Sequence, residues 1–191
     1  DYLGVQDVAL AGHDWGGIIG FGWAVRRPDL VSRLVVFNTA AFVGPIPLRI
    51  RASRWPLVGA LGVRGLNLFV RATTRIGCKR PERMTPEVKR GYLLPYDTYA
   101  NRVAVLEFVR DIPTRQGGRS RQTVEEIEAS LSVLRDRPMV VFWGGKDFCF
   151  NDYFLDEWKR RFPEAEVHRF ADAGHLVVED AHERILPLLT R

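Results

Sequence analysis

The strongest constraint on the fold of this chain is a glycine-rich turn between a short apolar run and an apolar helical pattern. Residues 8–11 are apolar, GHDWGG follows at residues 12–17, and a helical pattern over residues 18–27 ends before Pro28. A short apolar run of this kind is typical of a strand that is buried on both faces of a parallel sheet. Between a strand and a helix, glycines flanking a central Asp14 predict a nucleophile elbow, because the two backbones must pass closely there.

Further apolar runs and helical patterns predict an α/β fold around this turn. The runs that predict strands lie at residues 34–37, 139–143 and 167–170, and the helical patterns lie at residues 124–134, 154–162 and 180–189. Between these segments, residues 48–135 are Arg-rich and largely helical in pattern, after a boundary marked by Gly44, Pro45 and Pro47. This order predicts a parallel sheet whose sequence is interrupted by a helical insertion.

Length and composition exclude several classes of protein. With 191 residues, 46% of them hydrophobic, the chain is long enough for a sizeable core, and intrinsic disorder is excluded. Cys78 and Cys149 form no motif, which excludes a disulfide scaffold and predicts a reducing, cytoplasmic compartment. Neither a membrane-spanning run nor a signal peptide is recognisable. Because the chain begins with Asp1 rather than Met, we expect it to be a piece of a longer protein.

The positive charge is concentrated in the middle of the chain. Residues 43–135 hold 17 Lys and Arg against 8 Asp and Glu, whereas the remainder of the chain is net negative. Two interpretations are open, a solvated basic face and a surface that attracts an acidic partner or a membrane. No zinc motif, aromatic RNA-binding pattern or Lys-rich tail is present, so we do not expect a nucleic acid partner.

An aspartate at the centre of the elbow indicates a particular chemistry. Its carboxylate is ionised at neutral pH, so Asp14 can displace a leaving group from a saturated carbon without the help of a base. The product is an ester on the enzyme, and its hydrolysis by water requires a general base. His175, which follows the strand predicted at residues 167–170, is the candidate base. Asp147, just past the strand at residues 139–143, is the candidate acid that orients the imidazole.

Structural roles stay open for two of the residues in the turn. Asp14 stands where a helix N-cap is expected. Trp15 is either a packed core residue or a donor whose backbone and indole N–H groups reach the site. These alternatives cannot be separated by the spacing of the residues.

The other histidines and carboxylates are assigned lesser roles. His13 is predicted to be structural, because we expect its side chain to point away from the nucleophile. His168 is expected to be packed or exposed on a strand, and His182 to be solvated on a helix. Three carboxylates are weaker candidates for the acid partner: Asp152, Asp172 and Glu179.

Three of these motifs together resemble the haloalkane dehalogenase branch of the α/β-hydrolases. They are GHDWGG at residues 12–17, WGGKDF at residues 143–148 and AGH at residues 173–175. The chain order of nucleophile, acid and base is also that of the α/β-hydrolases. Within that branch, RMTPEV at 83–88, GYLLPY at 91–96, NRVAV at 101–105 and KDFCFND at 146–152 resemble the β-lactone decarboxylases of bacterial long-chain olefin biosynthesis.

The resemblance implies a fold and a division of the chain. It implies an α/β-hydrolase fold with a partly truncated parallel sheet, in which residues 1–42 and 136–191 form the core and residues 43–135 form an inserted helical cap. The family has an amino-terminal part, with the first strands and an oxyanion turn, that this sequence lacks. We therefore expect the chain alone to be poorly soluble or inactive, because the strand at residues 8–11 would expose a hydrophobic edge.

The resemblance also implies roles for the site residues. Asp14 would be the nucleophile, His175 the base and Asp147 its acid partner. Trp15 would donate an N–H group to a leaving halide or to a lactone oxygen. No metal and no cofactor is expected, since the sequence has neither a cluster of metal ligands nor a dinucleotide fingerprint.

Several functions remain open at this point. The decarboxylase resemblance implies a cis-β-lactone with two long alkyl chains as substrate, a cis-alkene and carbon dioxide as products, and other enzymes of an olefin pathway as partners. A haloalkane dehalogenase is the alternative. An epoxide hydrolase would need two tyrosines over the epoxide, for which Tyr92, Tyr96 and Tyr99 are available, and an inactive truncated relic is the last option.

The apolar residues of the insertion bear on the substrate. They are expected either to line an alkyl channel or to pack on the core, while the basic residues of the insertion would face a membrane surface or a partner enzyme. The apolar residues are Leu57, Val58, Leu61, Val63, Leu66, Leu68 and Phe69.

Overall fold

The structure is a computed structural model of the chain, and it describes residues 4–48, 50, 58–114 and 116–189. The strands are β1 (Val8–His13), β2 (Val31–Phe37), β3 (Met139–Gly144) and β4 (Glu166–Phe170). The α-helices are α1 (Trp15–Ala24), α3 (Leu68–Ile76), α4 (Pro86–Leu93), α5 (Val103–Asp111), α6 (Arg119–Ser130), α7 (Asp152–Arg161) and α8 (Val177–Leu189). A π-helix spans Val58–Gly65, and short 3₁₀ helices span Pro28–Leu30, Pro81–Arg83, Leu94–Tyr96 and Leu131–Leu134.

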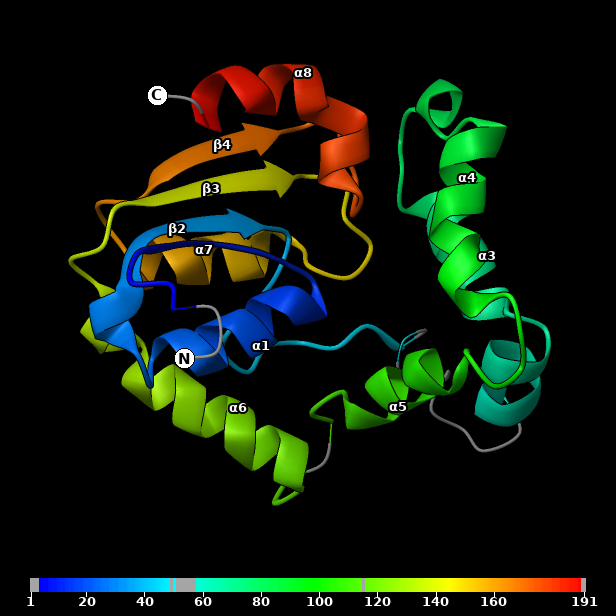
Figure 1. Cartoon of the computed structure of the whole chain (residues 1–191), viewed down its shortest axis with the longest axis horizontal. Helices are drawn as coiled ribbons and strands as arrows, with labels where there is room; N and C mark the ends of the chain where they lie inside the picture. The colour runs from blue at the N-terminus through cyan, green and yellow to red at the C-terminus, as the bar shows by residue number, and fades with distance from the viewer. Residues whose placement is uncertain (1–3, 49, 51–57, 115, 190–191) are drawn as a thin grey trace.

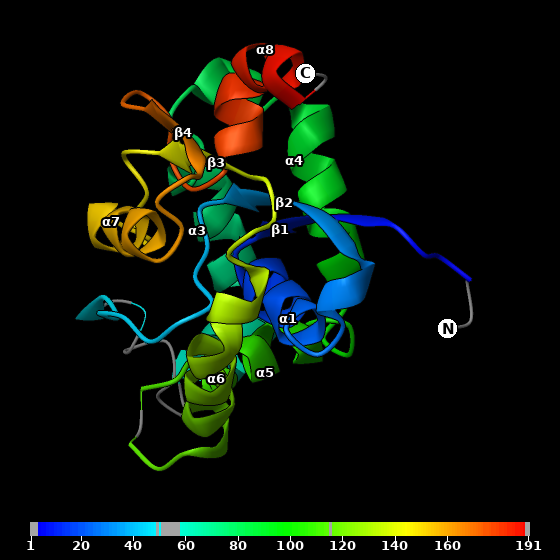
Figure 2. The same cartoon turned by 90° about the vertical axis from the view of Figure 1, so that its left-hand side faces the viewer.

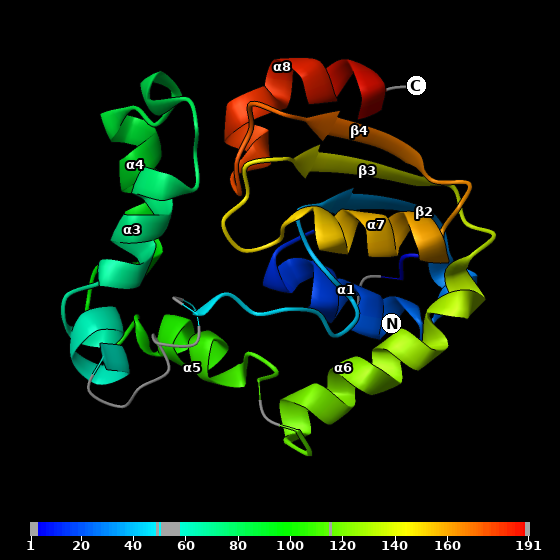
Figure 3. The ribbon, with the colours of Figure 1, turned by 180° about the vertical axis from the view of Figure 1, so that it is seen from behind.

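The four described strands form one parallel sheet in the order β1-β2-β3-β4. This confirms the α/β class predicted from the apolar runs. All four strands run in the same direction, so their carboxyl ends meet at one edge of the sheet, and that edge faces α3 and α4 (Figures 1 and 3). Each candidate site residue follows the carboxyl end of a strand, which brings distant parts of the sequence to this edge.

Alternating side chains of the central strands bury both faces of the sheet. Val36 and Val141 belong to one core cluster, together with residues of α1, α6 and α7. Val35 and Val140 belong to a second cluster with residues of α8. Figure 2 shows α8 on one side of the sheet and α1 with α7 on the other. Burial on both faces explains why β2 and β3 are continuous apolar runs in the sequence.

Helices α3, α4 and α5, here called the cap helices, stand beside the sheet rather than on its faces (Figure 1). They have a small core of their own, built on Val63, Val70, Val105 and Leu106. Helix α6 instead packs against α1, where Ile127 joins the core cluster of the sheet. Among the described residues, no helix combines the length and the apolar character needed to cross a membrane.

The apolar residues of the insertion are distributed differently from the prediction. Leu61, Leu66 and Leu68 are exposed, Val63 packs among the cap helices, and Phe69 is the one described member of the predicted set that lines the central cavity introduced below. Leu57 and the side chain of Val58 lie outside the described residues. The pattern misled because Val58–Gly65 is a π-helix, whose wider turn places different side chains on one face than an α-helix does.

The glycines of the elbow are not equivalent. A Cβ atom on Gly12 would lie 2.7 Å from the Cα atom of Gly17, and one on Gly17 would lie 2.1 Å from the hydroxyl of Thr39. A Cβ atom on Gly16 would meet nothing within 4 Å. The close approach of strand and helix therefore depends on Gly12 and Gly17, and Gly16, although part of the motif, is not sterically required.

We expect Gly17→Ala to lower the free energy of unfolding by about 1–3 kcal/mol, because the new methyl group displaces the buried Thr39. Gly16→Ala is the matched control, and we expect it to be neutral or slightly stabilising, since alanine is the better helix former. Urea unfolding of the two variants measures the difference. Equal stability of the two variants would contradict this account of the elbow.

Candidate active site

Asp14 stands at the turn between β1 and α1 in a conformation that few residues adopt. Its φ of 49° and ψ of −128° lie outside the regions of regular structure. The backbone carbonyl of Asp14 accepts hydrogen bonds from the Thr39 hydroxyl at 2.5 Å and from the Gly17 N–H at 3.1 Å, which hold the turn in place. Asp14 occupies the N-cap position of α1, as expected, but its carboxylate caps no backbone N–H of that helix. Asp14 instead lines the central cavity.

His175 and Asp147 form a buried pair beside Asp14. Asp147 Oδ2 lies 2.9 Å from His175 Nδ1, and the side chain of Asp147 is fully buried. The other carboxylate oxygen of Asp147 accepts the Cys149 backbone N–H at 2.6 Å. Both carboxylate oxygens of Asp147 are thus engaged, and these contacts hold the carboxylate in place. Because Asp147 pairs with Nδ1 of His175, the other ring nitrogen, Nε2, is the one left for chemistry.

Charge around His175 favours its protonated form. Burial alone would lower the pKa of His175, but the hydrogen bond and charge of Asp147, together with the charge of Asp14, outweigh burial and raise that pKa above its usual value. Asp14 therefore lies close enough to His175 to act on it electrostatically.

We expect NMR titration of His175 to give a pKa above the ordinary value of 6.5. Asp147→Asn should lower that pKa, because burial is then opposed only by the charge of Asp14. His168→Gln, which alters a histidine hydrogen-bonded to Glu166, serves as the control for assigning the signals. If the pKa of His175 were the same in Asp147→Asn as in the unchanged protein, the assignment of this pair would be contradicted.

His13 is placed differently from the prediction. Its side chain lines the central cavity, its ring lies 4.8 Å from that of His175, and its Nε2 lies 2.9 Å from the His175 backbone carbonyl. Because a carbonyl only accepts, Nε2 of His13 is the protonated nitrogen. Burial and the charge of His175 lower the pKa of His13, so the residue holds the loop of His175 as a neutral donor.

The central cavity has a volume of about 610 Å³ and lies between the sheet edge and the cap helices. Trp15 lines it, with its ring 5.4 Å from that of Phe108 on α5. Asp14, His13 and His175 supply its charged or titratable groups near the sheet. Most of the remaining wall is apolar: Ile18, Ala40, Phe42, Phe69, Val70, Val105, Phe108, Val109, Phe148, Phe150 and Leu176.

Two of the three tyrosines considered for an epoxide site reach this cavity. Tyr92 and Tyr96 line it, whereas Tyr99 is exposed and lies under the guanidinium of Arg64. The Tyr92 hydroxyl donates to Glu179 Oε1 at 2.9 Å. Burial and the charge of Glu179 raise the pKa of Tyr92, so this hydroxyl stays protonated and engaged.

The remaining candidates are engaged outside the cavity. Asp152 pairs with Arg169, and Asp172 pairs with Arg184, each through two hydrogen bonds. Glu179 accepts the tyrosine hydroxyl just described. His168 stacks on a phenylalanine of β3 and bonds Glu166, while His182 is half exposed, as expected from the sequence.

Asp180 is a site-related residue that the sequence did not single out. Its fully buried carboxylate accepts the backbone N–H groups of Lys79, Arg80 and Gly174, and the thiol of Cys78. Burial and this hydrogen bond raise the pKa of Cys78 to about 12. Asp180 therefore ties the segment before α4 to the loop that carries His175. In the sequence, the position of Asp180 five residues after His175 was the only feature that could have indicated this role.

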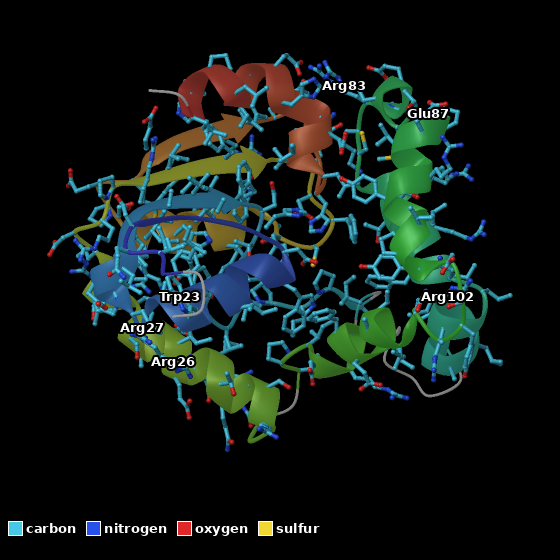
Figure 4. All side chains as sticks on the ribbon, in the orientation of Figure 1. Trp23, Arg26, Arg27, Arg83, Glu87 and Arg102 are labelled. Atoms are coloured by element: carbon cyan, nitrogen blue, oxygen red, sulfur yellow. The ribbon has the colours of Figure 1, made fainter. Side chains whose placement is uncertain are left out.

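Ion pairs continue this contact at the surface. Arg80 pairs with Asp172 at 2.8 Å, and Arg83 pairs with Glu183 on α8 at 2.7 Å. Figure 4 labels Arg83 where the cap side approaches α8. Exposed pairs of this kind are individually weak, so Asp180 is the buried centre of the contact.

Comparison with known proteins places this geometry in a family. The chain is 40% identical over 97% of its length to the cis-3-alkyl-4-alkyloxetan-2-one decarboxylase of Shewanella oneidensis. It is 39% identical over 98% of its length to the enzyme of the same name from Xanthomonas campestris pv. campestris. The chain spans 60% and 64% of the lengths of these two relatives.

A solved structure shares the fold. The haloalkane dehalogenase DatA from Agrobacterium tumefaciens matches 98% of this chain and 66% of its own, with a TM-score of 0.83 and 25% sequence identity. The family model described as the alpha/beta hydrolase family matches residues 1–188, nearly the whole chain. The parallel sheet, the strained elbow and this match lead to one conclusion: the chain belongs to the alpha/beta hydrolase family.

Proposed function

We propose that Asp14 is a carboxylate nucleophile that attacks a saturated carbon of an apolar substrate. The observation that carries this proposal is the position of its uncapped carboxylate, on a strained elbow at the wall of a largely apolar cavity. Among such substrates we propose a cis-3,4-dialkyl oxetan-2-one, a β-lactone, which would lose carbon dioxide to give a cis-alkene. The names of the relatives that are 39–40% identical support this choice of substrate.

Alkene formation selects the ring carbon that Asp14 attacks. Attack at ring carbon 4 breaks its bond to the ring oxygen, so the ring opens to an ester on Asp14 and a free carboxylate on carbon 3. The electron pair of the bond between that carboxylate and carbon 3 then forms the double bond, while the Asp14 carboxylate leaves carbon 4. Carbon dioxide departs and Asp14 is regenerated. Atoms and electrons balance without water and without a proton transfer.

The stereochemistry agrees with this route. Displacement inverts the configuration of carbon 4. Fragmentation then takes place with carbon dioxide and the Asp14 carboxylate leaving from opposite sides, which puts the two alkyl groups on the same side of the double bond, as they were in the ring. A cis lactone therefore gives a cis-alkene. Attack at the carbonyl carbon would instead give an anhydride, which water opens to a β-hydroxy acid.

We further propose roles for Trp15 and for the cavity. An N–H group of Trp15 would donate to the ring oxygen as it becomes a carboxylate. The apolar wall, with Phe108 and Val109 from α5, would hold the alkyl chains and exclude water. No metal or cofactor takes part in this route. A lipid-like small molecule is thus the proposed partner, and contact with pathway enzymes or a membrane through the basic insertion remains a further proposal.

A hydrolytic dehalogenation is the second candidate, and the buried pair of His175 and Asp147 favours it. Asp14 would displace a halide and form an alkyl ester, which water activated by His175 would then hydrolyse. The proposal for an epoxide hydrolase is weaker, because the Tyr92 hydroxyl would first have to leave Glu179.

The test offers the full-length protein two kinds of substrate. One is a cis-β-lactone with two long alkyl chains, with alkene measured by gas chromatography, and the other is a panel of bromoalkanes, with bromide measured. We expect alkene with little bromide. Bromide without alkene would overturn the decarboxylase proposal in favour of the dehalogenase. A β-hydroxy acid that retains the configuration of ring carbon 4 would overturn the attack at that carbon, because hydrolysis after attack there would give the inverted configuration.

A further inference from the structure

A second groove lies on the cap helices, apart from the central cavity. It has a volume of about 510 Å³ and runs between α3, α4 and the segment that leads into α5. None of Asp14, Asp147 and His175 lines it, and among the described residues only Tyr96 lines both spaces. Nothing in the proposed reaction at Asp14 uses this groove.

Positive charge dominates the groove. Arg71 comes from α3, and Lys89 and Arg90 come from α4, so two helices direct three cations into one space. Within the part of the chain that the structure describes, none of the three forms an ion pair or a side-chain hydrogen bond, and all three are exposed. Many other arginines of this protein are paired with carboxylates, for example Arg83 with Glu183.

The other charged groups of the groove are already engaged. Arg102, labelled in Figure 4, donates to the backbone carbonyls of Arg64, Gly65, Tyr96 and Asp97. The one carboxylate of the groove, that of Asp97, accepts the side-chain amide of Asn101 at 2.8 Å. Four cationic side chains outnumber this one carboxylate, so the net charge of the groove is positive, and an anionic group would be attracted to it.

Asn67 supplies a second, independent sign of a missing partner. It is 4% exposed, it lines the groove, and its amide nitrogen donates to the Tyr96 carbonyl at 3.1 Å. Its Oδ1 atom is buried and has no hydrogen-bond partner. Buried acceptors are normally satisfied, so a hydroxyl or amide donor on a ligand that reaches this atom from the groove would complete its hydrogen bonding.

Apolar surface borders the three cations. Leu93 and Leu94 line the groove, and Leu94 is 67% exposed. A bare anion would leave these side chains in water, whereas an anion attached to a hydrocarbon chain would cover them.

We propose that this groove binds a phosphate ester that carries an alkyl chain. Three cations from two helices match the several oxygens of a phosphate better than the two oxygens of a carboxylate. The hydrocarbon would lie on Leu93 and Leu94, and a hydroxyl next to the phosphate would donate to Asn67. The site is independent of the proposed lactone chemistry, because it shares no catalytic residue with it.

The test is calorimetric binding to the full-length protein. The probes are dodecyl phosphate below its micelle concentration, lysophosphatidic acid, inorganic phosphate and dodecanol. We expect the two amphiphilic phosphates to bind at least about tenfold more tightly than inorganic phosphate or dodecanol, and lysophosphatidic acid, which has the extra hydroxyl, to bind most tightly. Equal affinity for dodecanol and dodecyl phosphate would overturn the proposal.

A matched pair of variants locates the binding. The triple variant Arg71→Gln, Lys89→Gln, Arg90→Gln removes the groove cations, and Arg75→Gln, Arg119→Gln, Arg135→Gln removes the same charge at exposed positions that do not line the groove. We expect the first variant to bind dodecyl phosphate about tenfold or more weakly, and the second to change the affinity for it by less than about twofold. An equal loss of affinity in both variants would overturn the proposal. No loss of affinity in either variant would also overturn it, because the amphiphile would then bind in the central cavity.

Vesicles distinguish the two sources of such a phosphate. Phosphatidylcholine vesicles with and without phosphatidic acid are sedimented with the protein. Co-sedimentation that needs phosphatidic acid and the groove cations indicates a lipid in a membrane. Binding of the monomeric probes without co-sedimentation indicates a free phosphate ester, and absence of both overturns the proposal.

Discussion

Turnover of the β-lactone is expected to fall by about 10,000-fold or more when Asp14 is replaced by asparagine. The amide has nearly the shape of the carboxylate but lacks the negative charge that attacks carbon. The fold should survive, because the Asp14 carboxylate caps no helix and the turn is held by its backbone carbonyl. Measurement of kcat/KM for alkene formation checks this expectation, with circular dichroism to verify folding.

Two further variants make the result specific. Asp14→Ala excludes slow reversion, because an asparagine introduced at this position could deamidate back to aspartate. Asp152→Asn is the matched control, since that carboxylate pairs with Arg169 outside the cavity, and we expect it to keep nearly full activity. An Asp14→Asn variant with ordinary turnover would remove the nucleophile from the proposed mechanism.

Replacing His175 by glutamine is expected to separate the two candidate reactions. Hydrolysis of an ester on Asp14 needs a base, so bromide turnover after the first cycle should fall by about 100- to 10,000-fold. Alkene formation regenerates Asp14 without a proton transfer, so it should fall less than about tenfold. Mass spectrometry of the protein after exposure to a bromoalkane should reveal an alkyl ester that accumulates in the variant.

The control is His182→Gln, a half-exposed histidine on α8. We expect it to leave both reactions unchanged. If His175→Gln abolished alkene formation as thoroughly as hydrolysis, a proton transfer would have to be added to the decarboxylation route. The nucleophilic role of Asp14 would not be affected by that outcome.

The sheet could be predicted because its strands are buried on both faces. Residues 34–37 and 139–143 contain only apolar side chains, and β2 and β3 lie there with Val35 and Val141 on opposite faces. In a parallel sheet the carboxyl ends of strands meet at one edge, so Asp14, Asp147 and His175 could be expected together from strand ends alone.

Contacts between distant segments could not be predicted. The direction of the His13 side chain depends on the backbone carbonyl of His175, which lies 162 residues further along the chain. The pairing of Tyr92 with Glu179 likewise joins α4 to α8. No local pattern encodes such a contact, because each side chain was compatible with several surroundings.

Helix type was the other limit. The apolar spacing around Leu61 and Leu66 suggested one α-helical face, but Leu61 belongs to a π-helix that ends before Leu66, and both side chains are exposed. Asn67 then precedes α3 as its N-cap residue with a positive φ of 54°, a conformation that alters the direction of the chain between the two helices. Amphipathic patterns assume a constant 3.6-residue turn, and they fail where that turn changes.

The carboxylate of Asp180 has a mechanical consequence. It accepts the backbone N–H groups of Lys79 and Arg80 on the cap side and that of Gly174 on the loop of His175, so one buried carboxylate holds both segments. The positions of the cap segment at Lys79 and Arg80 and of the loop that carries His175 are therefore coupled to each other.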